Sequence, residues 1–374
     1  MIRLLNLFSW FTLFLAAGAC VERVDIEISD STRLLVIEGS ITDGPPPYFV
    51  QLSRANQVNS DKPVIPETGA LIMISDDLGY SEYLIESEPG IYRTSTMIQG
   101  EVGRTYFITV QTTDGTEYKS EPDKMNAVGE ILDIQYEFEA RTVVEPYGEV
   151  DANVLNIYVD SEAGGGEEQF VRWRYTGTYE VVTYPELHVT VTPPYSGYKD
   201  PWPCSGYILV GGPPGSGGIL LQVDECACCR CWVTVPEELP QLSDTQLIAG
   251  NIFNHVKVGE VPVNNASFHN KFKVEVEQMS MSRTAYEFFK LIREQKENAS
   301  SIFQPPSGEI RGNIKSVSQD SPVVGLFWAT AVKKKSLFIY PTDLPVKVTP
   351  IDFITLPCNE FYKNSSTQKP RGWD

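Results

Sequence analysis

Short apolar runs separated by turn residues recur about every ten positions in the first third of the chain. The runs are residues 34–41, 48–52, 71–75, 80–85 and 105–110. Turn residues 76–79 predict a hairpin between residues 71–75 and 80–85, and Asp114 with Gly115 forms a strong hairpin turn before residues 116–118. Short strands at this spacing are typical of a sandwich. We therefore predict an immunoglobulin-like or fibronectin-like β-sandwich domain over residues 34–122.

A second, larger β domain is expected over residues 130–352, after a hinge at residues 122–129. Its predicted strands include residues 131–138, 154–159, 170–184, 219–223, 246–252 and 271–278. Every second residue of 271–277 is apolar, as in a strand with one buried face. Residues 310–314 and 323–329 are expected to be central strands of this second core. Lys333 to Lys335 are most simply a charged turn between two strands.

One amphipathic helix is predicted near residues 283–298 of the second domain. Ser282 is a good N-cap, and the apolar residues Ala285, Phe288, Phe289 and Ile292 recur at helical spacing. We expect the helix to pack its phenylalanine face on a sheet. The fold class is therefore mainly β, with two β-sandwich domains, of which the second is larger and carries the helix.

The amino-terminal residues are typical of a secretory signal peptide. One basic residue, Arg3, precedes an apolar stretch that ends in small residues before Cys20. Residues 1–19 are predicted to be the signal peptide, Cys20 the acylated residue of a lipoprotein, and residues 20–33 a lipid-anchored linker. Residues 17–19 also fit ordinary secretory cleavage, and an uncleaved anchor is the third alternative. No later segment approaches the ~20 apolar residues of a spanning helix.

Composition excludes nucleic acid as a partner. The 374 residues include 30 lysines and arginines but 49 aspartates and glutamates, a net charge of −19. So acidic a chain is repelled by nucleic acid and by anionic lipid surfaces. The hydrophobic share of 42% is that of a folded protein.

The other cysteines indicate disulfides, because an even number in an exported chain is typical of a disulfide framework. They are Cys204, Cys226, Cys228, Cys229, Cys231 and Cys358. Cys358 is expected to tie the carboxy-terminal tail, residues 353–374, to the cluster. Six cysteines allow 15 pairings, and the sequence does not choose among them. A structural zinc site and a redox site are less favoured alternatives, and we expect no metal or other cofactor.

A loop rich in proline and glycine, residues 184–218, carries the candidate contacts to a ligand or partner. These aromatic residues are Tyr195, Tyr198, Trp202 and Tyr207. The alternative is that they only cap the open end of the sandwich. No catalytic motif is found, and the three histidines have no recognisable partner in the sequence. We predict no catalytic residues and no enzyme, with a hydrolase as the less favoured reading.

Several segments together resemble one family of lipoproteins. They are the lipid cysteine with residues 35–43 and 50–54, then residues 229–232, 276–282 with 285–286, 302–306 and 312–314, and the tail positions 357–358, 369–370 and 373. This combination is similar to the Bacteroidota lipoproteins grouped as domain of unknown function 4249. The family tail often has a C-x-x-C pair, whereas here Phe361 stands where the second cysteine would fall.

The resemblance implies an outer-membrane lipoprotein that is frequently encoded near TonB-dependent receptors, and it supplies no catalytic residues. We therefore expect a binding or accessory module, held on the outer membrane by its lipid, that serves a TonB-dependent barrel. The alternative is a surface adhesin or structural spacer.

Overall fold

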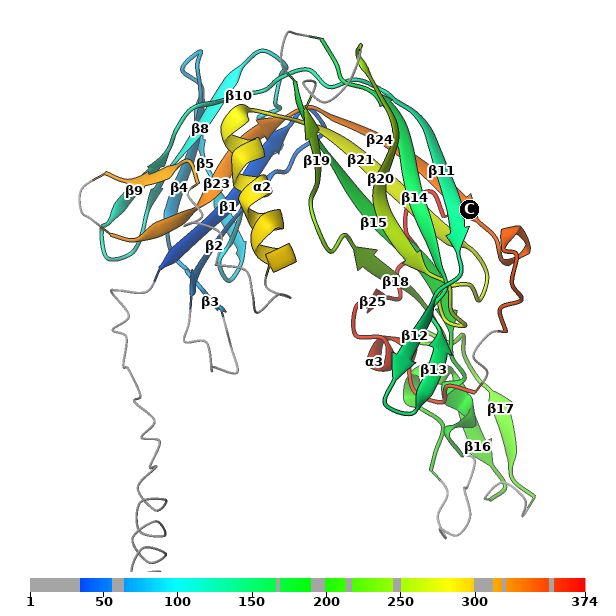
Figure 1. Ribbon diagram of the computed structural model, residues 1–374. Helices are drawn as coiled ribbons and strands as arrows, with labels where there is room; N and C mark the ends of the chain where they lie inside the picture. The colour runs from blue at the N-terminus through cyan, green and yellow to red at the C-terminus, as the bar shows by residue number, and fades with distance from the viewer. Residues whose placement is uncertain are drawn as a thin grey trace, which may run out of the picture.

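The computed structural model describes residues 34–55, 64–165, 169–189, 199–212, 217–244, 250–298, 312–317, 321–349 and 353–373. The predicted signal peptide, Cys20 and the linker 20–33 lie outside these residues. The described chain is mainly β, as predicted, and it forms an arch with two β-rich legs (Figure 1). None of the helices among the described residues has the length and apolar character needed to cross a membrane.

The first leg is a sandwich of two six-stranded sheets. One sheet runs β23 (Val323–Thr330), β1 (Leu35–Thr42), β2 (Phe49–Ala55), β7 (Ile91–Arg93), β6 (Ile85–Glu88), with β3 (Val64–Pro66) also on β2. The other runs β22 (Ile314–Ser316), β9 (Glu117–Ser120), β8 (Thr105–Gln111), β4 (Leu71–Asp76), β5 (Ser81–Tyr83), with β10 (Asp123–Lys124) also on β8. Alternate residues of these strands are buried, such as Ile37 of β1 and Ile72 of β4. The predicted hairpins β4–β5 and β8–β9 are confirmed.

Strands β22 and β23 correct the prediction for residues 310–314 and 323–329. Both strands belong to the first sandwich, not to the second core. Strand β23 pairs in parallel with β1 over eight residue pairs, from Leu35–Val323 to Thr42–Thr330. Phe327 faces the first core, while Leu326 and Trp328 face the helix on the other side. A parallel strand buried on both faces reads as a continuous apolar run, and such a run does not indicate which core it joins.

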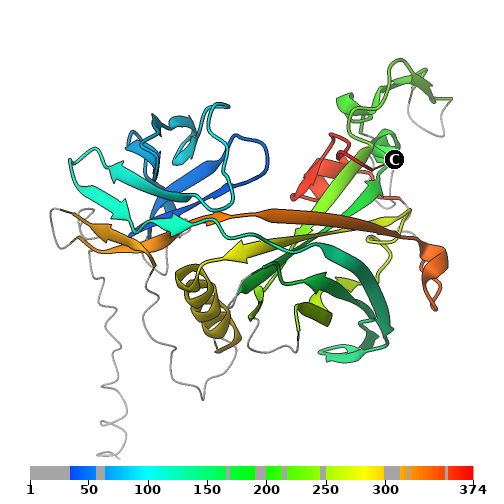
Figure 2. The same cartoon turned by 90° about the horizontal axis from the view of Figure 1, so that it is seen from above.

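The same strand continues into the second leg. After Ala331, β24 (Val332–Ile339) pairs antiparallel with β21 (Phe272–Met281). Figure 2 shows this long orange ribbon running from one leg to the other. The predicted charged turn at residues 333–335 is therefore wrong, because these lysines lie within β24. Lys333 contacts Glu130 at 2.6 Å, and Lys334 forms an ion pair with Glu277 of β21.

The second leg packs a three-stranded sheet on a six-stranded one. The three-stranded sheet runs β11 (Ile131–Glu139), β14 (Val154–Glu162), β20 (Ile252–Pro262). The larger sheet runs β24, β21, β15 (Phe170–Val182), β18 (Arg230–Pro236), β25 (Ser365–Ser366), with β19 (Gln241–Asp244) also on β15. Their facing side chains form one core around Trp173. The predicted strand at 246–252 lies mostly outside the described residues, and β20 begins at its last position.

Two hairpins extend this leg beyond its core. They are β12 (Thr142–Glu145) with β13 (Gly148–Asp151), and β16 (Tyr207–Val210) with β17 (Ile219–Gln222). Short helical turns complete the leg: η2 (Pro185–Val189), η3 (Pro203–Ser205), η5 (Pro341–Asp343) and α3 (Cys358–Phe361).

Helix α2 (Arg283–Asn298) lies in the angle between the two legs (Figure 1). The Ala285 N–H donates to the Ser282 hydroxyl oxygen at 3.2 Å, which confirms the predicted cap. Phe288 and Ala285 pack with Met279 and Met281 of β21 and with Trp328 of β23. The helix therefore covers apolar residues of both legs at once, and the predicted packing of its phenylalanine face is confirmed.

Buried polar side chains fill the seam where β23 passes into β24. The Ser280 hydroxyl donates to the Asn126 carbonyl (2.7 Å) and accepts from the Ala331 N–H (3.0 Å). One Asp123 carboxylate oxygen accepts from the Ala329 N–H at 2.8 Å, and an Asp43 oxygen accepts from the Val332 N–H at the same distance. These side chains thus satisfy the hydrogen bonds of backbone groups at the point where the strand leaves the first sheet and joins the second.

Asn313 closes the first sandwich where its two sheets meet. Its side-chain nitrogen donates to the Phe327 carbonyl (2.6 Å), and its side-chain oxygen accepts from the Phe327 N–H (3.0 Å). We predict that Asn313→Ala lowers the free energy of unfolding by about 2–4 kcal/mol, because both buried backbone groups lose their partner. Denaturant unfolding measures the loss. The control Asn265→Ala, at an exposed position, is expected to change it by less than about 0.5 kcal/mol; equal losses would contradict the role of Asn313.

Asp123 makes stability depend on pH. Burial raises the pKa of its carboxyl, although the Ser282 hydroxyl and the Ala329 N–H favour the charged form. The folded state therefore holds this proton more tightly than the unfolded state, so the charged carboxylate lowers stability above its folded pKa. We predict that Asp123→Asn is more stable than the parent at pH 7. This advantage should shrink as the pH falls toward the ordinary value of 3.8. Urea unfolding at several pH values tests this, and an advantage that grows at low pH would refute it.

Candidate functional site

Three disulfides hold the far end of the second leg. They join Cys204 to Cys228, Cys226 to Cys229 and Cys231 to Cys358. All six predicted cysteines are paired, so none is a thiolate that zinc could bind. We call the part they hold the stapled tip, defined as residues 183–189, 199–212, 217–231 and 353–366.

The stapled tip is held together by backbone bonds as well as by sulfur, and a short strand joins it to the large sheet. The Tyr184 N–H donates to the Ile354 carbonyl (2.7 Å), and the Cys358 N–H donates to the Cys228 carbonyl (3.0 Å). Strand β25 pairs with β18 at Trp232 and Val233. Cys231 and Cys358 are themselves fully buried in a small apolar cluster. The carboxy-terminal tail therefore acts as a clamp across the base of the tip.

The four aromatic candidates are not gathered in one groove among the described residues. Tyr195 and Tyr198 lie outside the described part of the chain. The Trp202 ring packs against the His188 ring, with 5.1 Å between centroids, and its backbone N–H donates to the Pro185 carbonyl. The Tyr207 hydroxyl reaches the Gln222 side chain at 3.4 Å across the start of the β16–β17 hairpin. Trp202 thus contributes to the base of the tip, and Tyr207 belongs to the hairpin.

The hairpin β16–β17 carries an exposed apolar face that the aromatic prediction missed. Ile208 lies opposite Leu221, and Val210 lies opposite Ile219, so these four side chains share one face. Their exposed fractions range from 41% for Val210 to 63% for Ile219. The signal was present in the sequence, because residues 201–223 contain no charged residue.

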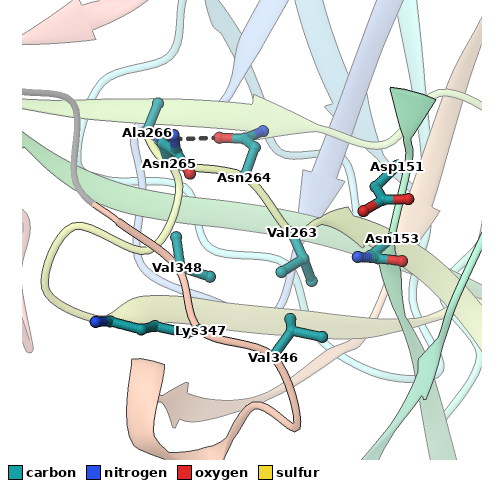
Figure 3. Close-up of a pocket in the computed structure, with 9 residues that line it drawn as sticks. All are labelled: Asp151, Asn153, Val263, Asn264, Asn265, Ala266, Val346, Lys347 and Val348. Carbon is teal, nitrogen blue, oxygen red and sulfur yellow. Dashed lines mark hydrogen bonds between the residues drawn. The ribbon is translucent and has the colours of Figure 1, made fainter. Parts of the chain in front are cut away.

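A second candidate is a polar hollow of about 490 Å³ at the side of the same leg (Figure 3). It is lined by Asp151, Asn153, Val263, Asn264, Asn265, Ala266, Val346, Lys347 and Val348. The Asn264 side-chain oxygen accepts hydrogen bonds from the Ala266 and Ser267 N–H groups at 2.9 and 3.0 Å. That carboxamide oxygen shapes the loop through both bonds, so the hollow offers fewer polar groups to a ligand than its lining suggests.

An ion-pair network lies beside this hollow, at the base of the β12–β13 hairpin. Arg141 contacts Glu139 at 2.7 Å and Glu260 at 2.9 Å. Bonds from Arg141 and Asn156 lower the pKa of Glu139 to about 2. The Arg141 N–H also donates to the Asn153 side-chain oxygen. Every group of the network is thus occupied in holding the hairpin, and acid–base chemistry is not what this carboxylate is poised for.

Two of the histidines lie against aromatic rings. The His255 ring stacks on Tyr158 with 3.9 Å between centroids, and His188 packs on Trp202. Within the residues that the structure describes, no group of three or more histidine, cysteine, aspartate or glutamate side chains is placed to hold a metal ion.

The fold and the stapled tip define a mainly β, disulfide-bonded protein. Residues 21–336 match the family model described as Domain of unknown function (DUF4249). The chain therefore belongs to this family. No curated protein matches the chain. The match ends within β24, so the tail that carries Cys358 lies beyond it.

The disulfides should differ in their contribution to stability. The Cys231–Cys358 bridge spans 127 positions, whereas Cys226–Cys229 spans three. Closing the longer loop removes more chain entropy from the unfolded state. We predict that Cys231→Ser with Cys358→Ser lowers the free energy of unfolding by roughly 4–5 kcal/mol, and Cys226→Ser with Cys229→Ser by about 2 kcal/mol. Denaturant unfolding of the two double variants measures both, and the reverse order would refute the entropic account.

Proposed function

We propose that this protein is an outer-membrane lipoprotein, anchored through Cys20, that serves as a non-enzymatic accessory module of a TonB-dependent barrel. The amino-terminal pattern of a basic residue, an apolar stretch and Ala19-Cys20 supports the anchor. The three disulfides support residence in an oxidising compartment.

The observation that carries the proposal is the placement of the stapled tip. In Figure 1 the hairpin of the tip is the lower end of the second leg, and β1 begins toward the lower end of the shorter first leg. Cys20 stands 14 positions before Leu34 in the chain. A lipid anchor on that side therefore keeps the tip near the plane of the membrane, which is where a barrel protein would be met.

The aromatic residues of the loop remain the candidate contacts to the barrel or its ligand. Tyr207 is the better placed of the two described ones, because Trp202 is packed on His188. Aromatic side chains with one polar end are common in protein interfaces. Tyr195 and Tyr198 complete the proposed set.

The test is co-purification from membranes in mild detergent. The parent chain is expected to bring down an outer-membrane β-barrel, and Tyr207→Ala is expected to lower the yield at least fivefold. The matched control is Tyr83→Ala, since Tyr83 is 66% exposed on the first leg. Recovery of monomer alone from the parent would contradict the accessory role and favour a spacer or adhesin. Mass spectrometry of the amino terminus tests the anchor separately.

A further inference from the structure

The β16–β17 hairpin is apolar on both faces. One face carries Ile208, Val210, Ile219 and Leu221, which are 41% to 63% exposed. Leu209 and Leu220 lie opposite each other on the other face and are half-buried. Val223, just after the hairpin, is 58% exposed. About half of the first face is therefore accessible to solvent, and so to a partner.

The surroundings of the hairpin favour lipid over protein as that partner. The 23 residues from 201 to 223 carry no charge in a protein whose net charge is −19. Protein interfaces have polar rims and about one hydrogen bond per 100–200 Å². The only polar side chains of β16 and β17 are Tyr207 and Gln222, which contact each other at the base. Proteins at membrane surfaces place aliphatic side chains deepest and tyrosine at the level of the headgroups, and the hairpin has its side chains in that order.

The hairpin is also held rigidly. Two-stranded hairpins are marginal in water by themselves. Here the Val223 N–H donates to the Gly206 carbonyl (2.8 Å), and the Ala227 N–H donates to the Cys204 carbonyl (2.9 Å). The Cys204–Cys228 disulfide closes the base behind these bonds. The aliphatic side chains therefore stay exposed instead of folding back on the leg.

The position of the hairpin agrees with a membrane contact. It projects from the lower end of the second leg, and β1 begins toward the lower end of the first leg (Figure 1). Counted from Cys20, the 14 positions before Leu34 reach at most about 50 Å when fully extended. An anchor at Cys20 would thus hold the hairpin within reach of the same bilayer.

We infer that the β16–β17 hairpin inserts its aliphatic side chains shallowly into a lipid surface without net charge, as a second membrane contact beside the proposed anchor. Only the side chains enter, because the open edges of a two-stranded hairpin would lose their hydrogen bonds to water at greater depth. Because the segment carries no charge, no charged side chain has to lose its water on contact with the lipid.

The test uses the chain carrying Cys20→Ser, so that no acyl chain contributes, and vesicles of phosphatidylcholine and phosphatidylethanolamine. Co-sedimentation should show binding by this chain. Ile208→Ser with Leu221→Ser should weaken it at least tenfold. The matched control, Leu71→Ser with Tyr83→Ser at exposed positions of the first leg, should stay within twofold. Ile208→Phe, which keeps the apolar contact, should also stay within twofold, which separates lipid contact from misfolding.

Several outcomes would overturn the inference. They are no binding by the Cys20→Ser chain, equal loss in the control, and unchanged binding by the hairpin variant. If the hairpin variant still binds vesicles but no longer brings down the barrel in the co-purification assay, the face would be assigned to a protein partner. If the Cys20→Ser chain forms dimers but does not bind vesicles, and the hairpin variant is monomeric, the face would be assigned to a second copy of the chain. Because the assay contains neither acyl chain nor barrel, its failure is distinguishable from failure of the proposed function.

Discussion

The parallel pairing of β1 with β23 is the constraint on which the rest of the arch depends. It joins the first described strand to residues 323–330 along eight pairs, and β23 then continues as β24 into the second leg. A single extended strand thus belongs to both sandwiches, and helix α2 is packed against it in the angle. The relation of the two legs is fixed by strand pairing and buried side chains, not by a flexible linker.

Three of the segments that resemble the family meet along β23 and the start of β24. Asp43, Ser280 and Asn313 come from three of those segments, and each bonds a backbone group of residues 327–332. Their buried bonds satisfy groups that strand pairing leaves over. We therefore interpret much of the family pattern as a record of how the legs are joined. The first sandwich also cannot be completed before residue 330 is available, a long-range requirement that slows folding.

Local patterns predicted local structure well. The hairpins around Asp76 and Asp114 and the helix after Ser282 follow from turn residues, caps and periodicity within a dozen positions. The parallel partner of β1 could not be found in this way, because an apolar run does not indicate which sheet the strand joins. The same limit misplaced Lys333 to Lys335, because the acidic partners of Lys333 and Lys334, Glu130 and Glu277, are distant in the sequence. Disulfide formation was predictable from the number of cysteines, but their pairing depended on the path of the tail.

The stapled tip shows a different balance from the seam. At the seam, polar groups are buried and hydrogen-bonded. At the hairpin, aliphatic side chains are exposed, and the base of the hairpin is held by the Cys204–Cys228 and Cys231–Cys358 disulfides and by the tail. Exposed apolar side chains promote self-association, and the net charge of −19 opposes it. Exposing apolar side chains to water is unfavourable, and a looser loop could bury them. Disulfides that hold them exposed are useful only if a partner covers these side chains. The hairpin therefore presents a rigid apolar face at the end of the second leg, where an external partner could cover it.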